Sequence, residues 1–216
     1  MSTAESTQTA VIAESHIEEH AHRDDVRSRM GMWLFLFSEL LLFGGLFLMY
    51  SVYRYMHQTD FSIASKEMNT FLGTLNTVIL LTSSLTMALA INAMQRGKKG
   101  LSISLQIFTI LCGAAFMVNK VIEWSHEFAE GNYPGSAILA SKPKGQILYF
   151  GLYYSMVGLH GLHVLVGMTV ITFMLVFTIR GKITPDNYVK LEAAGLYWHL
   201  VDIIWIFLFP LFYLIT

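Results

Sequence analysis

Three histidines stand inside long apolar stretches of this sequence. His160 and His163 are three residues apart in GLHGLHVLVG, and His199 follows in EAAGLYWHLVD. Two imidazoles at this spacing lie on one face of a helix, so with a third histidine they can hold zinc or copper. The same groups can instead carry protons or act as hydrogen-bonding contacts between helices. An HxxH spacing is frequent by chance, so the spacing by itself leaves these interpretations open.

Other ionisable residues in such stretches are Glu39, Lys120, Glu123, Glu192 and Asp202. Placing each of these side chains in hydrocarbon costs roughly a few kcal/mol, so each is expected to have a bonding partner or a functional role. Lys120 and Glu123 stand about 60° apart on one helix face and can form an ion pair, or else reach separately to the membrane surface. Glu192, His199 and Asp202 share another helix face. A polar seam between neighbouring helices is the expectation that follows.

The histidine positions disfavour haem. A haem between two membrane helices needs opposed imidazoles, usually with a second pair most of a bilayer away, whereas His160, His163 and His199 are expected to cluster. The single Cys112, in TILCGAAF, excludes an internal disulfide and a multi-cysteine metal site. We therefore expect no metal or other cofactor in this chain, with a three-histidine metal site as the alternative.

The composition places these groups in a membrane protein. Hydrophobic residues make up 54% of the 216 residues, charged residues only 13%, and the mean hydropathy is +0.52. These values are too apolar for an ordinary soluble domain. The formal net charge of -1 provides no basic surface for nucleic acid.

Five apolar segments are each long enough to cross a bilayer, at about 20 residues per span. Their expected bounds are 30–55, 71–95, 101–127, 146–180 and 191–215. The sequence thus predicts an all-α integral membrane protein with five transmembrane helices in one bundle, occupying 29–216. Residues 1–28 have neither a basic start nor an apolar core, so we expect a polar N-terminal tail and not a secretory signal peptide. Its potential metal ligands are His16, Glu18, Glu19, His20 and His22, for which a solvated tail is the expected role.

The basic residues predict an orientation. With five spans, nine lysines and arginines fall on the N-terminal side and four on the opposite side, while Lys120 lies within a span. Positively charged loops resist translocation, so the N-terminus is expected in the cytoplasm and the C-terminus outside.

Four stretches, taken in order, resemble subunit III of the haem-copper respiratory oxidases, the cytochrome c oxidase subunit III family. They are GMWLFLFSELLLFGGLF, LNTVILLTSSLTMALA, GLHGLHVLVG and EAAGLYWHLVDIIWIFLFPLFYL, and with the sequence between them they cover nearly everything from Gly31 to Thr216. The matching positions include Glu39, Asn76, Thr77, Ser83, Ser84, Thr86, His160, His163, Glu192, Tyr197, Trp198, His199, Asp202 and Trp205.

The chain also departs from the longer members of that family. Those have seven helices, of which the five here correspond to the last five, and this resembles a short bacterial form. The lipid-filled cleft of the long form would lose one wall, which leaves bound phospholipid open. Lys120 replaces a glutamine, and Tyr188 and Lys190 replace a histidine and a glycine before Glu192.

The resemblance implies a function. The chain would be an accessory, non-redox subunit of a proton-pumping terminal oxidase that reduces oxygen to water. Haem and copper would lie in subunit I, with further copper in subunit II. This chain would pack beside subunit I, with subunit II and other small membrane subunits as further partners, in the bacterial inner membrane. It would steady subunit I during turnover and support proton uptake, and its histidines would be helix contacts.

Several alternatives remain at this stage. The sequence does not separate a cytochrome c oxidase from a quinol oxidase, and an accessory subunit of nitric oxide reductase is a near relative in function. From other classes, a stand-alone proton channel or transporter would also keep buried carboxylates and histidines. A metal-dependent membrane enzyme would use His160, His163 and His199.

The charge bias generates a test of topology. Single cysteines at Lys99 and Asn187, in a Cys112→Ser background, should react with an impermeant thiol reagent only from the cytoplasmic side. Labelling of either position from outside sealed cells would reverse the orientation.

Overall fold

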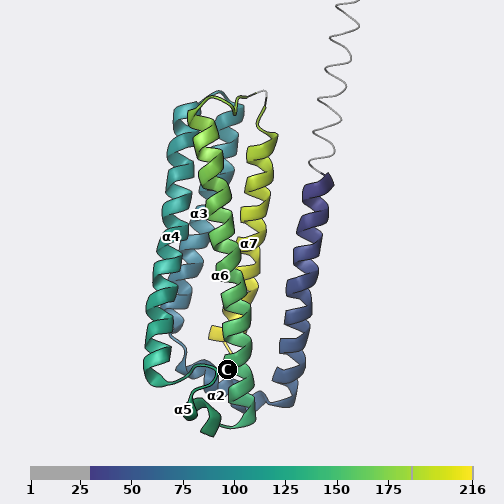
Figure 1. Ribbon diagram of the computed structural model, residues 1–216, viewed down its shortest axis with the longest axis vertical. Coiled ribbons are helices and arrows are strands. Elements are labelled where there is room, and N and C mark those ends of the chain that lie inside the picture. Colours follow the sequence, from purple (N-terminus) through teal and green to yellow (C-terminus); the bar gives the residue numbers. More distant parts are fainter. Residues whose placement is uncertain (1–29, 186, 216) are drawn as a thin grey trace, which may run out of the picture. The chain divides into compact units, whose positions relative to one another are not determined.

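The computed structural model describes residues 30–185 and 187–215, which are almost entirely helical (Figure 1). Five helices are long and apolar enough to span a membrane. They are Met30–Met56, α3 (Thr70–Gln95), α4 (Lys99–Glu130), α6 (Lys144–Ile179) and α7 (Val189–Tyr213). Two shorter helices, α2 (Gln58–Glu67) and α5 (Ala137–Ser141), lie in the connections. The only β-type pairing in the described residues is an isolated bridge between Thr184 and Asn187.

These helices confirm the predicted all-α fold with five membrane spans. The helix ends follow local chemistry. The Asn69 side chain accepts a hydrogen bond from the Leu72 amide and caps the start of α3, while α4 ends at Gly131, whose φ of 78° suits glycine. The sequence analysis missed α2 because it is short and largely polar, and α5 because it has only five residues. The predicted tail, 1–28, lies outside the described residues.

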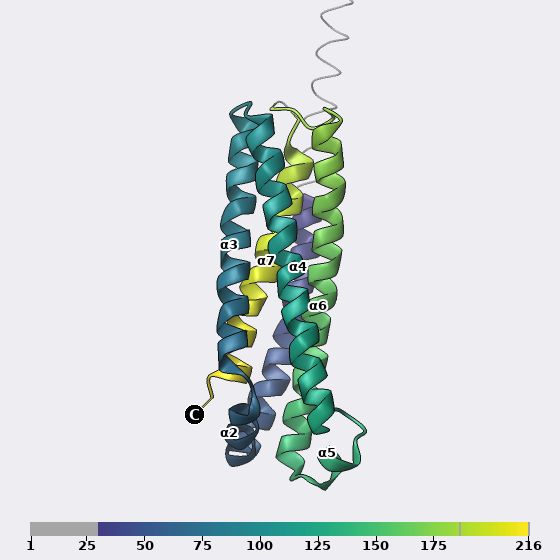
Figure 2. The same ribbon diagram turned by 90° about the vertical axis from the view of Figure 1, so that its left-hand side faces the viewer.

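The helices α3, α4, α6 and α7 form a four-membered ring. α3 packs against α4 and α7, and α6 packs against the same two helices (Figures 1 and 2). α2 contacts α6 and α7 at the end of the bundle that also carries α5. This arrangement gives the four long helices a shared interior, into which each of them can place side chains.

The chain divides into two compact units, Met1–Glu39 and Leu40–Thr216. Within the second unit, the C-terminal part of the first helix contacts α6 and α7 through one stripe of aromatic residues. Phe43 meets the ring of His163 at 5.4 Å, and Phe47 meets Phe207 at 6.1 Å. One turn further on, the Tyr50 hydroxyl donates to the Leu211 carbonyl. Because these positions follow i, i+4 and i+7 spacing, a single helix face makes the contact.

The bundle exposes an apolar surface, as expected in lipid, and buries polar side chains together with its apolar core. Large apolar side chains such as Leu48, Phe71, Val121 and Phe173 are more than half exposed. Polar side chains that are fully buried include Asn76, Ser83, Ser102, Gln106, Thr109 and His160. Lipid tails solvate apolar surface, so helix association in a membrane depends on close packing and on hydrogen bonds between helices.

Close packing is clearest at Trp198, which α7 inserts between two glycines. A Cβ atom on Gly167 of α6 would lie 2.8 Å from the indole, and one on Gly113 of α4 would lie 2.9 Å from it. Any side chain at either position would therefore displace the tryptophan. The last glycine of GLHGLHVLVG serves this contact.

Candidate functional site

The three membrane histidines point to three different neighbours. His160 is fully buried, with its ring 5.2 Å from that of Trp205 and 5.6 Å from that of Phe116. His163 contacts the ring of Phe43 on the first helix. His199 on α7 lies 2.6 Å from the hydroxyl of Ser84 on α3. The two residues of the HxxH motif thus share a helix but serve separate helix contacts.

The position of one ring proton of His163 follows from its backbone contact. Its Nδ1 lies 2.8 Å from the carbonyl oxygen of Leu159, one turn earlier in α6. A carbonyl oxygen only accepts hydrogen bonds, so Nδ1 carries a proton in this contact. This orientation fixes the ring against its own helix.

The ligand atoms of His160, His163 and His199 do not gather at one point. Within the described residues, the potential ligands that lie within 4.8 Å of one another belong to His126, Glu127 and Glu130, at the end of α4. The three-histidine metal site considered from the sequence is therefore not assembled. The tail histidines, by contrast, lie outside the described residues.

The predicted acidic residues occupy different environments. Asp202 is buried, one turn beyond His199. No hydrogen bond reaches its carboxylate within the described residues, although the Ser84 hydroxyl lies nearby. Glu192 is half-buried in the first turn of α7, where the helix dipole favours a negative charge. Glu39 is half-buried in the first helix.

Lys120 and Glu123 form an ion pair inside the bundle. The Lys120 Nζ lies 3.0 Å from one carboxylate oxygen of Glu123 and 3.2 Å from the other. The two side chains are only 6% and 2% exposed, so the lysine does not reach to the membrane surface. A buried pair of this kind persists only when the remaining donors and acceptors are also satisfied.

Two tyrosines complete the group, which we call the Lys120 cluster: Lys120, Glu123, Tyr153 and Tyr213. Tyr153 on α6 donates its hydroxyl to Glu123 at 2.5 Å, and Tyr213 on α7 donates to the same carboxylate oxygen. The ammonium donates to the Tyr213 oxygen at 2.5 Å and lies 4.7 Å from the ring centre of Trp205. Every proton of the ammonium therefore meets an oxygen, and the aromatic ring faces the positive charge.

The cluster joins three helices through one carboxylate. α4 supplies both charges, while α6 and α7 each supply one phenol. Since the ammonium, Tyr213 and Glu123 bond one another in a closed ring, a proton can pass from lysine to carboxylate through the Tyr213 hydroxyl without leaving the ring. The cluster can therefore exist as a charged or a neutral pair in the same geometry.

The sequence analysis missed the two tyrosines. Ten tyrosines occur in the chain, and nothing in YFGLYYS or FPLFYL separates Tyr153 and Tyr213 from the others. One local signal was available: a lysine and a glutamate at i, i+3 inside an apolar helix require further partners. Which residues provide them depends on how α6 and α7 pack against α4.

A line of hydroxyl and amide groups on α3 contacts the other helices. The indole of Trp205 donates to Thr77 at 3.0 Å, and the indole of Trp198 donates to Ser83 at 3.0 Å. Asn76 accepts from Asn119 of α4 at 2.9 Å. These contacts explain why LNTVILLTSSLTMALA carries polar residues on a membrane helix.

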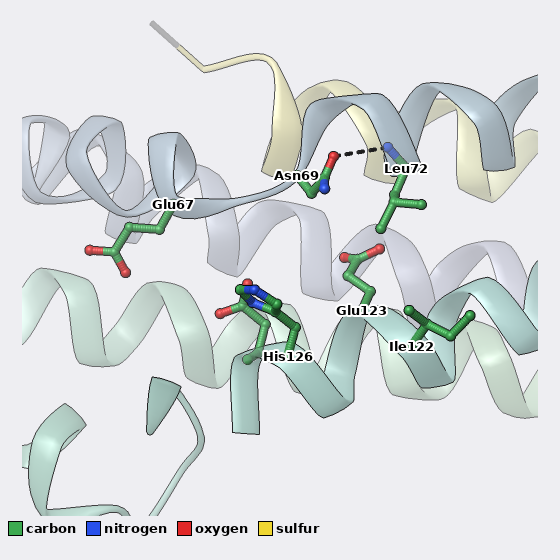
Figure 3. Close-up of a pocket in the computed structure, with 7 residues that line it drawn as sticks. Glu67, Asn69, Leu72, Ile122, Glu123 and His126 are labelled. Carbon is green, nitrogen blue, oxygen red and sulfur yellow. Dashed lines mark hydrogen bonds between the residues drawn. The ribbon is translucent and has the colours of Figure 1, made fainter. Parts of the chain in front are cut away.

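A pocket of about 430 Å³ opens beside the Lys120 cluster. Figure 3 shows Glu67, Asn69 and Leu72 on one side and Ile122, Glu123 and His126 of α4 on the other. Two of the lining carboxylates have further partners: the Asn132 amide donates to Glu127 at 3.1 Å, and Lys142 pairs with Glu67 at 2.7 Å. This network ties α2 and α4 to the segment before α6.

The geometry of the cluster generates a prediction. Glu123→Gln should lower the free energy of unfolding by about 3 kcal/mol or more, because it leaves the buried ammonium without a counter-charge. Adding Lys120→Gln should restore much of that loss, since glutamine keeps the hydrogen bonds without the charge. Chemical or thermal unfolding of the purified variants measures both effects.

The exposed His126–Glu130 pair, 3.4 Å apart, provides the matched control. Glu130→Gln should change stability by less than about 1 kcal/mol, as surface pairs contribute little. If the Lys120 and Glu123 variants instead show additive losses, the two side chains act independently.

Comparison with known proteins assigns the family. The sequence matches the family described as Cytochrome c oxidase subunit III over residues 2–216. It is 34% identical over 202 residues to the Pseudomonas aeruginosa protein named cytochrome bo(3) ubiquinol oxidase subunit 3, covering 92% of this chain and 90% of that one. It is 30% identical over 215 residues to cytochrome c oxidase subunit 3 of Thermostichus vulcanus, covering 99% and 98%.

A third relative is cytochrome c oxidase subunit 3 of Alkalihalophilus pseudofirmus, 31% identical over 209 residues and covering 95% of this chain and 96% of its own length. These matches span nearly whole chains, so they extend to all five membrane helices. They confirm the resemblance drawn from the four sequence stretches. The chain belongs to the cytochrome c oxidase subunit III family, the accessory third subunits of respiratory oxidases.

Proposed function

We propose that this chain is the non-redox third subunit of a proton-pumping terminal oxidase that reduces oxygen to water. It stabilises subunit I, where haem and copper lie, and supports proton uptake by the complex. Subunit II and other small membrane subunits are its further partners. The complex lies in a bacterial inner membrane, with the N-terminus of this chain in the cytoplasm.

The observation that carries this proposal is how the buried polar groups are used. His163, His199 and the Lys120 cluster are engaged in contacts within and between helices. The two indoles of α7 are engaged with α3 in the same way. Polar groups used in this way build a rigid scaffold, which suits a subunit that steadies a catalytic neighbour.

The electron donor defines two forms of the proposal. Cytochrome c is the donor named for the family and for the relative in Thermostichus vulcanus, whereas the Pseudomonas aeruginosa relative is named for ubiquinol. We propose cytochrome c as the donor to the complex. Oxygen consumption by the purified complex with reduced cytochrome c or with ubiquinol separates the two.

Co-purification tests the subunit assignment. An affinity-tagged form of this chain, expressed with its neighbouring genes, should retain a haem-bearing subunit I in detergent. The isolated chain should show no haem absorption and no one-to-one metal, because the rings of His160, His163 and His199 face separate neighbours. A stoichiometric metal that is lost in His163→Ala would contradict the proposal and restore the enzyme alternative. Isolation without any partner, together with proton flux in vesicles, would favour a transporter.

Glu39 provides the test of a proton-linked role. A carboxyl at this position can exchange a proton with a path in subunit I, whereas an amide of the same shape cannot. Glu39→Gln should assemble normally, yet slow proton uptake or shorten active life in sustained turnover, and more so as pH rises and protons become scarce. Stopped-flow proton uptake and progress curves across pH measure this.

Ser38→Ala is the matched control, because the exposed Ser38 hydroxyl bonds only its own helix, at the Phe35 carbonyl. It should behave as the unchanged protein. Unchanged turnover and lifetime in Glu39→Gln at every pH would reduce Glu39 to a packing residue.

A further inference from the structure

One face of α4 carries a row of ionisable residues that leads from the bundle interior to the end of the helix. The row consists of Lys120, Glu123, Glu127 and Glu130, whose spacing of three or four residues places them on the same face. Lys120 is 5% exposed, and Glu123 and Glu127 are each 3% exposed. The Glu130 side chain, by contrast, is 48% exposed. The row therefore connects the buried Lys120 cluster with the surface.

The pocket of about 430 Å³ lies beside this row, and both Glu123 and Glu127 line it. The Glu123 carboxylate belongs at the same time to the Lys120 cluster, where it accepts hydrogen bonds from Tyr153 and Tyr213. Figure 3 shows this carboxylate rising from α4 towards Leu72 on the opposite wall. One water molecule needs only about 15 Å³ of accessible space and two to four polar partners. The pocket thus has room and polar groups for several waters that reach Glu123.

The network beside the pocket carries a surplus of negative charge. The Asn132 amide donates to Glu127 at 3.1 Å and to Glu67 at 3.3 Å. It also donates to Glu130 at 3.4 Å, so one amide gathers three carboxylates. Lys142 supplies the ammonium of this network, bonding Asn132 at 2.9 Å and Glu67 at 2.7 Å. Three carboxylates against one ammonium leave an excess of negative charge, which attracts protons to this end of the bundle.

The ionisable groups around Glu123 come from α2, α4, α6 and α7, because α3 contains none. α2 and α4 supply the charged groups and an imidazole: Glu67, Lys120, His126 and Glu127. α6 and α7 supply phenols: Tyr149, Tyr153, Tyr154 and Tyr213. His160 of α6 lies against the Trp205 ring that faces Lys120. A phenol hydroxyl both donates and accepts, so a proton that reaches Glu123 can continue through Tyr213 to Lys120.

We propose that the Lys120 cluster is a proton-binding site that exchanges protons with bulk water through this pocket. A proton from pocket water binds Glu123, which converts the neutral ion pair into an ammonium beside an uncharged acid. Release of that proton to pocket water restores the ion pair. Glu127 and His126 accept protons at the wall of the pocket and pass them to and from Glu123. This exchange is a property of the chain itself and does not rest on its role in the oxidase.

Thiol labelling tests whether water enters the pocket. In a Cys112→Ser background, Leu72→Cys places a thiol on the pocket wall, whereas Val121→Cys places one on the outward apolar face of α4, where Val121 is 64% exposed. A charged methanethiosulfonate reagent attacks thiols that ionise in water, so in nanodiscs Leu72→Cys should react at least about tenfold faster than Val121→Cys. Equal rates, or a faster reaction at Val121→Cys, would contradict selective access of water to the pocket.

Infrared spectroscopy of the same nanodiscs follows the proton itself. A protonated carboxyl has a C=O stretch that a carboxylate lacks, and this band shifts when the proton is replaced by deuterium. Acid-minus-alkaline difference spectra of the unchanged protein should contain one such band that is lost when Lys120→Gln and Glu123→Gln are combined. Leu72→Trp fills the pocket and should slow deuteration of the band at least about tenfold, because water entry then requires local opening. Val121→Trp is the matched control and should leave the rate unchanged.

A buried ion pair with only a structural role gives different results. The proposal is wrong if the combined variant loses no band at any pH at which the protein stays folded. It is also wrong if the band deuterates as fast in Leu72→Trp as in Val121→Trp. Should the combined variant fail to fold, the comparison of Leu72→Trp with Val121→Trp decides, because both leave the charges of the cluster in place.

Discussion

Inside a membrane bundle, a buried charge determines the positions of the helices around it, because no water is present to complete its hydrogen bonds. The Lys120 ammonium imposes this requirement here. Its counter-charge, Glu123, is on the same helix, but the carboxylate also takes a phenol from Tyr153 of α6 and one from Tyr213 of α7. The relative rotation and height of α4, α6 and α7 are therefore fixed together. Next to Lys120, Asn119 reaches Asn76 and brings α3 into the same register.

The tryptophans of α7 also connect helices through buried hydrogen bonds, but the groups involved are neutral. The hydroxyls of Thr77 and Ser83 each donate to a carbonyl of their own helix and accept an indole N–H from α7. Each hydroxyl is thus satisfied on both sides, which is needed where an unpaired group is costly. The indole of Trp198 can approach closely only because Gly113 and Gly167 leave room for it. Close packing and hydrogen bonding depend on each other at this point.

The histidines show why residue type and spacing did not decide between a metal site and a scaffold. His160 and His163 are neighbours on α6, as a pair of ligands would be. The helix nevertheless turns His160 towards Phe116 and Trp205, while His163 faces Phe43 on another helix. His199 joins α7 to α3 through Ser84. A metal site requires its ligand atoms to converge, and the packing of these helices directs the rings apart.

The sequence by itself determined the five membrane helices, since apolar segments of sufficient length must form helices when only internal partners are available for the backbone. It also determined the family, because four ordered stretches with unusual polar residues carry more information than any single one. It placed Lys120 and Glu123 on one helix face but left open whether they pair or separate. The short helices α2 and α5 and the tyrosines of the Lys120 cluster were decided only by the tertiary structure. The physical reason is that helical periodicity fixes which residues share a face, whereas the partner of each face depends on how helices distant in sequence pack together.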